Sequence, residues 1–365
     1  MDQGNQSAGD SSRSPWDLTL SHESGVLRVR RLDDGRFELH GEAADPNVFV
    51  PHSPCVTSYP LPLIEAILQC YGAVHACDEI GRDVDEHDAA LDVEHCVQAY
   101  FSDRIFAEKV AILDYGCGAG SSTLALARLF GNARIVGVEM VGNFVEVARR
   151  RAAHYGLNNL RFETVPAGSQ EFLPEYDYVF LNAVYEHLLP NERSEVLGSI
   201  WRALRPGGTL FLNQTPHRWF PVETHTSGLP LVNYLPPALA LWAIRHYCGR
   251  SVRNFTWDQL LRAGVRGGTI EEIMRHIRRS DPSACLRRPV RIAKSWAGIW
   301  YATKRERMAN LNGAMRVAFS ATQALVSGLR LPLSPYLSLA ITKSGTANHE
   351  PDSPDGRAKS HGRSY

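Results

Sequence analysis

Three glycines and an acidic residue stand close together in the segment DYGCGAG, residues 114–120. The segment follows the apolar run VAIL and precedes a stretch that begins with two serines. Glycines let the backbone turn tightly and let a ligand approach where a Cβ atom would clash. Glu139 lies 19 residues after Gly120 at the end of another apolar run, where a carboxylate can accept hydrogen bonds from both ribose hydroxyls. The pattern therefore predicts a site for a ribose-bearing cofactor.

Two other nucleotide-binding patterns fit this segment less well. A dinucleotide fold carries GxGxxG, whereas the glycines here are spaced GxGxG and Ser121 follows the third one. The segment also lacks the lysine of a phosphate-binding P-loop. A nicotinamide-dependent oxidoreductase is therefore the weaker alternative, which a fluorescence titration with NADH would decide.

Three histidines are candidates for acid–base chemistry near the same site. His187 follows the apolar run YDYVFLNAV, and His217 and His225 lie in TPHRWFPVETHTSGLP. An imidazole titrates near neutral pH and can take the proton of a reacting hydroxyl, although each histidine could equally cap or pack. We treat all three as candidate catalytic bases. A metal set of His217, Glu223 and His225 lacks a clear fourth ligand, so we expect no metal.

The elements that must position these residues alternate along the chain. Predicted strands cover 110–116, 133–139, 160–165, 176–184 and 208–215, and predicted helices cover 121–131, 144–156 and 192–204. Strands that alternate with helices at this spacing form parallel βαβ units, so we predict an α/β fold with a doubly wound, mostly parallel sheet. Ligands bind such sheets at the carboxyl ends of the strands, where the glycine segment falls.

Five further regions surround this predicted core, residues 108–215. Polar tails at 1–15 and 344–365 should be disordered. Residues 16–107 form an N-terminal extension, with a hairpin around Asp-Asp-Gly followed by helices. Residues 216–334 are too many for a plain connection, so we predict a mostly helical insertion or substrate lid. The apolar run 335–343 supplies the final strand.

Four stretches together resemble the class I S-adenosylmethionine-dependent methyltransferases, over residues 108–215. They are VAILDYGCGAG, the stretch IVGVE that ends at Glu139, YDYVFLNAVYEHL, and the LRPGG turn before the fifth strand. The resemblance implies a Rossmann-like methyltransferase fold and S-adenosylmethionine as cofactor. The residues that it implies for cofactor binding are Asp114, Gly116, Cys117, Gly118, Gly120, Glu139, Met140, Asn182 and Ala183.

The resemblance also implies a role for most of these residues. The three glycines form the floor beneath the amino-acid and ribose parts of the cofactor, and Asp114 lies near its methionine end. Glu139 holds the ribose, and Met140 packs on the adenine. Asn182 and Ala183 line the floor near the sulfonium. One departure concerns the acid that many members carry after strand three, because VPAGSQE (165–171) has Pro166 there and leaves Ser169 or Gln170 to read the adenine.

The same family features bear on the methyl acceptor. The strand 176–184 runs into Asn-Ala-Val-Tyr, not into the Asn/Asp-Pro-Pro-Tyr/Phe with which amino-methylating nucleic-acid enzymes hold an exocyclic amine. No paired-glutamate loop of the protein arginine type follows either. We therefore expect O-methylation of a small molecule or glycan: a sugar, a glycolipid or a secondary metabolite. The sequence leaves the oligomeric state open.

Charge is distributed unevenly along a chain whose net charge is zero. Residues 1–100 carry 18 acidic and 6 basic side chains, whereas residues 245–307 carry 15 basic and 5 acidic ones. The two regions could simply neutralise each other across a surface. Alternatively, the basic segment meets an anionic partner, as in a nucleic-acid-directed methyltransferase or a cofactor-binding partner protein. With the apolar runs 236–250 and 315–329 it would also suit an anionic bilayer or a lipid-linked acceptor.

Cysteine usage and hydropathy bear on the compartment. The seven cysteines form no CxxC pair, which favours reduced thiols. The first 15 residues have no apolar core, so we expect no secretory signal. The apolar stretch 229–244 holds three prolines and is shorter than the roughly 20 residues of a membrane span. We expect a cytoplasmic protein, with peripheral contact at the inner membrane face as a hypothesis to test.

Overall fold

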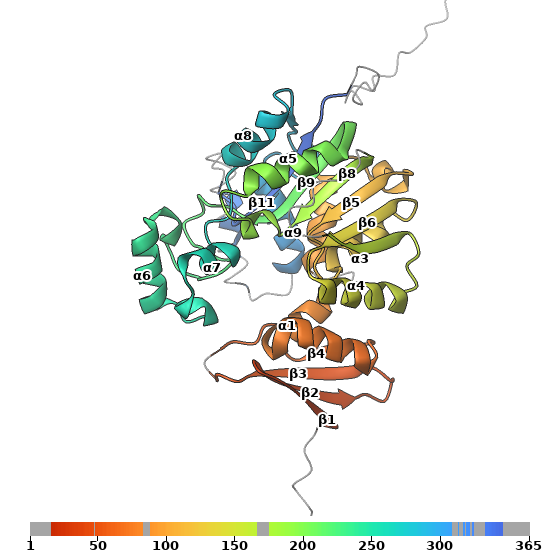
Figure 1. Cartoon of the computed structure of the whole chain (residues 1–365), viewed down its shortest axis with the longest axis vertical. Coiled ribbons are helices and arrows are strands. Elements are labelled where there is room, and N and C mark those ends of the chain that lie inside the picture. Colours follow the sequence, from red (N-terminus) through yellow and green to blue (C-terminus); the bar gives the residue numbers. More distant parts are fainter. Residues whose placement is uncertain are drawn as a thin grey trace, which may run out of the picture.

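A seven-stranded sheet organises the computed structural model (Figure 1). Its strands run in the order β10-β11-β9-β8-β5-β6-β7. Five of them are parallel, whereas β11 is antiparallel to β9 and β10 is antiparallel to β11. The bounds are β5 Ala111–Tyr115, β6 Arg134–Glu139, β7 Leu160–Thr164, β8 Tyr176–Asn182, β9 Leu204–Pro216, β10 Cys285–Leu286 and β11 Tyr336–Thr342. The predicted α/β class with a mostly parallel sheet is confirmed.

The structure describes most of the chain. The described residues are 16–46, 48–82, 88–165, 175–308, 313, 317, 319–321, 323, 324 and 333–345. Pro166 and the two candidate adenine-reading residues, Ser169 and Gln170, lie outside them. Both predicted tails apart from residues 344 and 345, and most of the apolar run 315–329, also lie outside them. Within the described residues, no helix has both the length and the apolar character to cross a bilayer.

Helices cover both faces of the sheet. On one side lie α2 (Asp88–Gln98), α3 (Ser121–Leu129) and α9 (Trp296–Met308), and on the other lie α5 (Arg193–Ala203) and α8 (Ile270–Ser280). Strand β8 shows why both sides must be covered: Phe180 packs into one core, and its neighbours Val179 and Leu181 pack into the other. Alternate strand residues point to opposite faces, so a strand that is apolar throughout must be buried on both. Helix α4 (Gly142–His154) packs against β6 and β7.

A second, four-stranded antiparallel sheet lies at the bottom of Figure 1. It consists of β1 (Leu18–His22), β2 (Gly25–Arg31), β3 (Phe37–Ala43) and β4 (Cys55–Thr57), and the hairpin predicted around Asp-Asp-Gly is β2–β3. Helix α1 (Leu61–Gly81) packs across this sheet and also against α4. The 3₁₀ helix η1 (Asp103–Ala107) leads into β5. Helix α1 and the four-stranded sheet therefore lie beside α4, next to β6 and β7 of the main sheet.

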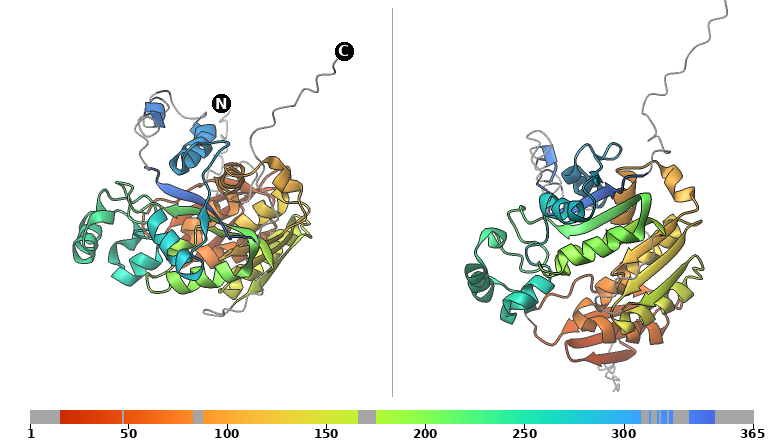
Figure 2. Two further views of the ribbon diagram at one scale, coloured as in Figure 1. Left: turned by 90° about the horizontal axis from the view of Figure 1, so that it is seen from above. Right: turned by 45° about the horizontal axis from the view of Figure 1, so that its top comes forward.

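The insertion between β9 and β11 divides into two parts. Helix α8 packs against α5, and β10 joins the edge of the main sheet, so this part belongs to the main core. The other part is η3 (Val232–Tyr234), α6 (Pro237–Tyr247), η4 (Ser251–Asn254) and α7 (Trp257–Arg262), which enclose a small core of their own. Figure 2 shows α6 and α7 at the end of the molecule away from β6 and β7.

Candidate cofactor and acceptor site

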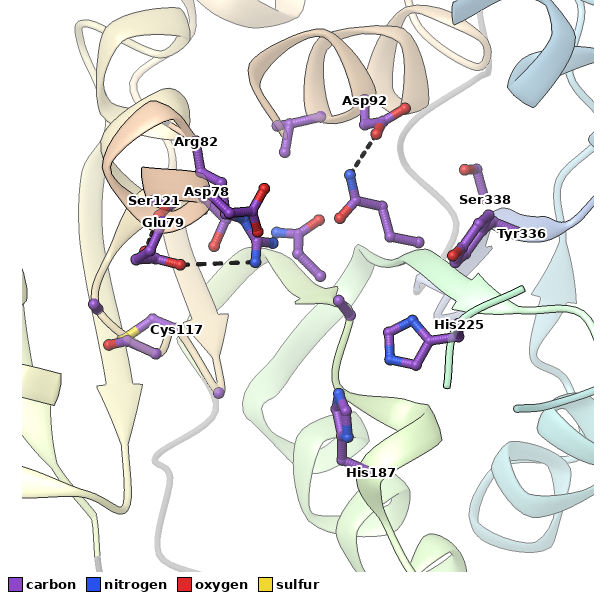
Figure 3. A pocket seen from close by; sticks show the side chains of 18 of the residues that line it. Asp78, Glu79, Arg82, Asp92, Cys117, Ser121, His187, His225, Tyr336 and Ser338 are labelled. Carbon is purple, nitrogen blue, oxygen red and sulfur yellow. Dashed lines mark hydrogen bonds and ion pairs between the residues drawn. The ribbon is translucent and has the colours of Figure 1, made fainter. Parts of the chain in front are cut away.

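A cavity of about 440 Å³ opens at the carboxyl ends of β5 and β8 (Figure 3). Gly116, Cys117 and Gly118 line one part of it, and Asn182 and Ala183 line the adjoining part. Side chains from α1, α2, α9 and β11 complete the wall. The cavity thus lies where a doubly wound sheet binds ligands, and it is large enough for a small molecule.

The three glycines of the loop have different surroundings. All three have positive φ, a backbone conformation that favours glycine. A Cβ at Gly116 would lie 2.8 Å from Val184, and one at Gly120 would lie 2.9 Å from the Cβ of Ala148, so both are needed for close packing. A Cβ at Gly118 would meet only the Tyr71 hydroxyl, at 3.5 Å. Gly118 is therefore the glycine whose missing side chain leaves space for a ligand.

The carboxylate of Glu139 faces this loop from the end of β6. Its Oε2 accepts a hydrogen bond from the Gly118 amide at 3.1 Å, and its Oε1 accepts one from Met140 at 2.8 Å. Glu139 itself is not among the cavity-lining residues and lies beside them. Met140 leaves 58% of its surface exposed next to it, which is unusual for an apolar side chain that serves only the core.

Asp114 is buried beneath the loop. Its Oδ2 accepts hydrogen bonds from the hydroxyls of Ser122 and Thr123, each at 2.7 Å, and its Oδ1 accepts one from Asn182 at 3.3 Å. Burial raises the pKa of Asp114 to about 6, although these three hydrogen bonds favour the charged form. The residue fixes the start of α3 and the end of β8 rather than lining the cavity.

A buried ion pair joins the N-terminal unit to the loop. Arg151 of α4 donates to the Glu79 carboxylate of α1 at 2.6 Å and to the Ala119 carbonyl at 3.2 Å. The Ser121 hydroxyl donates to the same Glu79 oxygen at 2.6 Å. The Ala119 amide in turn donates to the Tyr71 hydroxyl at 3.3 Å. Helix α1 is therefore part of the scaffold that holds the glycine loop.

Two of the three candidate histidines come together at the cavity. His187, in the 3₁₀ helix η2 (Tyr185–His187), and His225 have ring centroids 5.5 Å apart, and Figure 3 shows both at one side of the cavity. The His187 Nδ1 is 2.6 Å from the Arg262 carbonyl, which makes it the protonated nitrogen and leaves Nε2 as an acceptor. Burial lowers the pKa of His187, and it lowers the pKa of His225 to about 4. Both rings are therefore neutral at pH 7, and neither is a strong base.

The third candidate, His217, lies apart from this pair. It is only 4% exposed, its amide donates to the Pro335 carbonyl, and it is not among the residues that line the cavity. The Glu223 carboxylate accepts hydrogen bonds from the amides of His225, Thr226 and Ser227. Glu223 thus holds its own loop, and the group of potential metal ligands that the described structure brings within 4.8 Å of one another contains His225 but neither His217 nor Glu223.

Sequence reasoning missed several residues of the cavity wall. They come from helices and strands without recognisable motifs: Tyr71, Asp78, Glu79, Arg82, Asp92, Gln214, Trp300, Thr303, Lys304, Tyr336 and Ser338. Asp92 accepts a hydrogen bond from Gln214, and Arg82 lies 3.7 Å from Glu79. No local pattern marks these positions, because only the tertiary packing of α1, α2, α9, β9 and β11 brings them to the cavity.

These features define a class I S-adenosylmethionine-dependent methyltransferase fold, and residues 112–208 match the family described as "Methyltransferase domain". The methyl donor of this class is S-adenosylmethionine. The site fits that molecule, because the missing side chain of Gly118 leaves space for a ligand beside the loop and the Glu139 carboxylate faces the loop from β6.

Among curated proteins, the chain is similar to three whose names involve this cofactor or methyl transfer. It is 32% identical over 114 residues to trans-aconitate 2-methyltransferase of Deinococcus radiodurans, covering 31% of this chain and 40% of that protein. It is 29% identical over 116 residues to carboxy-S-adenosyl-L-methionine synthase of Erwinia tasmaniensis, covering 31% of this chain and 47% of that protein. It is 38% identical over 115 residues to ubiquinone biosynthesis O-methyltransferase of Methylocella silvestris, covering 30% of this chain and 42% of that protein. The chain thus spans less than half the length of each.

Proposed function

We propose that the protein transfers the methyl group of S-adenosylmethionine to a hydroxyl of a small molecule, with a sugar, a glycolipid or a secondary metabolite as the acceptor. One observation carries the proposal: a single cavity extends from the glycine loop to the pair His187 and His225. Donor and acceptor can therefore lie in contact, which is the main requirement of an in-line displacement. Two of the relatives, trans-aconitate 2-methyltransferase and ubiquinone biosynthesis O-methyltransferase, are named for small-molecule chemistry and support the same class.

The chain's own residues have distinct tasks in this proposal. Gly118 and Glu139 hold the ribose end of the donor, which supplies a methyl group on a positively charged sulfur. Asn182 and Ala183 border the path of the methyl group, and Ala183 is fixed by the hydrogen bond of its amide to the Asn213 carbonyl. The acceptor oxygen forms a bond to the methyl carbon while the carbon–sulfur bond breaks and its electron pair returns to sulfur. The hydroxyl proton leaves to the Nε2 of His187 or to water.

Arg82 bears on the charge of the acceptor. Its side chain lines the cavity, stays 37% exposed and has Glu79 as a partner at 3.7 Å, a distance that leaves room for a second anion. Lys304 lines the same cavity from α9. Among the lining residues, this guanidinium and this ammonium are the groups that would pair with a carboxylate or phosphate of the acceptor, beside the carboxylates of Asp78, Glu79 and Asp92 in the same lining.

Two measurements test the proposal. Isothermal titration with S-adenosylmethionine should show micromolar binding, and tritium from its methyl group should enter the small-molecule or lipid fraction of a cell extract. Label in the nucleic-acid fraction would favour the alternative of a nucleic-acid-directed enzyme. Absence of any cofactor binding would refute the enzyme proposal altogether.

Several arginines of the basic segment 245–307 already contact other residues of the protein, which weighs against the nucleic-acid alternative. Arg262 pairs with Glu192, and the Arg250 guanidinium donates to three backbone carbonyls of the His225 loop. Arg287 stacks 4.5 Å from the ring centroid of Phe101. Salt-insensitive, weak binding of RNA and DNA is therefore expected, whereas affinity that falls steeply with salt would contradict this.

We further propose that α6 rests on an anionic membrane surface. Its outer face exposes Leu239, Trp242 and Tyr247 by 53%, 51% and 66%, and Arg245 lies exposed beside them. The neighbouring segments expose Trp219, Leu231 and Tyr234 as well. Aromatic side chains with a polar edge, next to a basic residue, suit the headgroup region of a bilayer. This position would bring a lipid-linked acceptor to the molecule.

Flotation with liposomes tests the membrane proposal. The protein should float with phosphatidylcholine vesicles that contain one quarter phosphatidylserine, and less with pure phosphatidylcholine. The double variant Leu239→Ala/Trp242→Ala should lose flotation, whereas Phe49→Ala, which removes an aromatic ring that is 82% exposed elsewhere, should keep it. Equal flotation of both variants, or a dimer that masks α6 in solution, would overturn the proposal.

A further inference from the structure

Glu186, His187 and His225 bring three potential metal ligands together beside the cavity. One ligand atom from each lies within 4.8 Å of the other two. Glu186 and His187 are adjacent in η2, whereas His225 comes from the loop after β9, nearly 40 residues further along the chain. Two imidazoles and one carboxylate are a donor set that binds divalent transition metals and leaves a position open for a further ligand.

The Glu186 carboxylate shows that the cluster is more than a chance gathering of side chains. Glu186 is fully buried, and its Oε2 accepts a hydrogen bond from the Thr215 hydroxyl at 3.3 Å. Within the described part of the chain, its Oε1 has no hydrogen-bond partner. This same oxygen lies 3.9 Å from the His187 Nε2. A buried carboxylate oxygen without a partner carries a large desolvation penalty, which a bound cation would remove.

The two histidines are also presented as ligands. Because the His187 Nδ1 donates to the Arg262 carbonyl, its Nε2 lone pair faces Glu186, an arrangement in which a backbone carbonyl orients a metal-binding imidazole. The His225 ring lies over Gly264, where a Cβ would come within 2.5 Å of it, so the glycine lets the ring approach. Among the described residues, no hydrogen bond engages either ring nitrogen of His225.

We propose that Glu186, His187 and His225 bind one divalent transition-metal ion at the acceptor end of the cavity. The positive charges of Arg82 and Arg250 act on this region and oppose a cation, and Glu186 is the single carboxylate of the set. The site therefore favours ions that bind imidazole strongly, such as Zn²⁺ or Co²⁺, over Mg²⁺ or Ca²⁺. If the proposed function holds, the open position of the ion would take the acceptor hydroxyl, and the hydroxyl proton would leave to water because the ion occupies the Nε2 of His187.

Metal titration of the full chain tests this site. After treatment with a chelator, Co²⁺ is added and its visible absorption bands are followed, and Zn²⁺ is then added as a competitor. One equivalent should bind, with bands of a low-coordinate site with nitrogen ligands. His225→Ala and the isosteric Glu186→Gln should each weaken Co²⁺ binding at least ten-fold. His246→Ala, which removes an exposed imidazole on α6, should bind like the wild type.

Two results would overturn the proposal. The first is that the wild type shows no saturable Co²⁺ binding. The second is that the Glu186→Gln or His225→Ala variant binds Co²⁺ as tightly as the wild type while its circular dichroism is unchanged. Titration with S-adenosylmethionine on the metal-free protein separates this site from the proposed function. Cofactor binding without Co²⁺ binding removes only the metal site, and Co²⁺ binding without cofactor binding removes only the transferase proposal.

Discussion

Replacing Gly118 with alanine tests whether the glycine loop is the floor of the cofactor site. The added methyl group would meet no protein atom closer than the Tyr71 hydroxyl at 3.5 Å, so the folded protein has room for it. Alanine is disfavoured in the left-handed backbone at φ +53, so the substitution should cost about 1 kcal/mol of folding stability. The methyl group also occupies space in the cavity. A methyl carbon keeps other carbon atoms about 3.5 Å away, so a ligand lying on this loop must shift.

Gly35 provides a matched control in the turn between β2 and β3. It has φ +84, and a Cβ there would have no atom within 4 Å. Gly35→Ala should therefore lose a similar amount of stability, about 1 kcal/mol, without touching the cavity. Any difference in cofactor affinity between the two variants then comes from the cavity alone.

The assay is isothermal titration with S-adenosylmethionine, with urea unfolding of both variants measured in parallel. Gly118→Ala should bind the cofactor at least ten-fold more weakly than the wild type, a loss of about 1.4 kcal/mol, and Gly35→Ala should bind it normally. If the two variants bind within two-fold of each other and both are folded, the cofactor does not lie on this loop.

Three more predictions concern single side chains. Glu139→Ala should weaken cofactor binding about 30-fold, because two hydrogen bonds to a carboxylate contribute roughly 2 kcal/mol or more, whereas Glu163→Ala on β7 should not change it. Asp114 has a folded-state pKa of about 6, above its ordinary 3.8, so its contribution to stability is complete below the lower value and is lost as the pH rises through 6. The unfolding free energy of the wild type relative to Asp114→Asn should therefore fall by about 1 kcal/mol between about pH 5 and 7.5, and a constant difference would contradict the burial argument. Thr269→Ala should destabilise the protein by about 1 kcal/mol in urea unfolding, because the Thr269 hydroxyl accepts the Glu272 amide at the start of α8, and an unchanged midpoint would argue against this cap.

The main sheet could be predicted because its strands are apolar on both faces. Strands β5, β6 and β8 each contain a short apolar run (AIL, IVGV and YVFL), which local sequence reveals directly. Strand β10 has two residues and β4 has three, so neither shows a periodic pattern. The division of the insertion was missed as well, since nothing local distinguishes α8, which packs on the main sheet, from α6, which does not.

The site was predictable only where it depends on local sequence. The glycine loop and Glu139 follow from a motif and its spacing. His187 and His225 were recognised individually, but their association with Glu186 depends on how the loop after β9 folds back over η2. His217 was given equal weight, yet its backbone contacts with Pro335 and Gly268 place it away from the cavity. These distinctions arise from tertiary packing, which residue types alone do not encode.

The burial of Arg151 has a consequence for any attempt to trim the chain. Among the partners of its guanidinium are the Tyr59 hydroxyl and the Glu79 carboxylate and carbonyl, which belong to residues that precede the matched family segment. An excised fragment of residues 108–215 would lose these partners, and it would expose to water Ala119 and Val147, which pack in one core with α1. We therefore expect the segment shared with the relatives to be less stable alone than in the full chain, and shortened versions of the protein should keep residues 16–107.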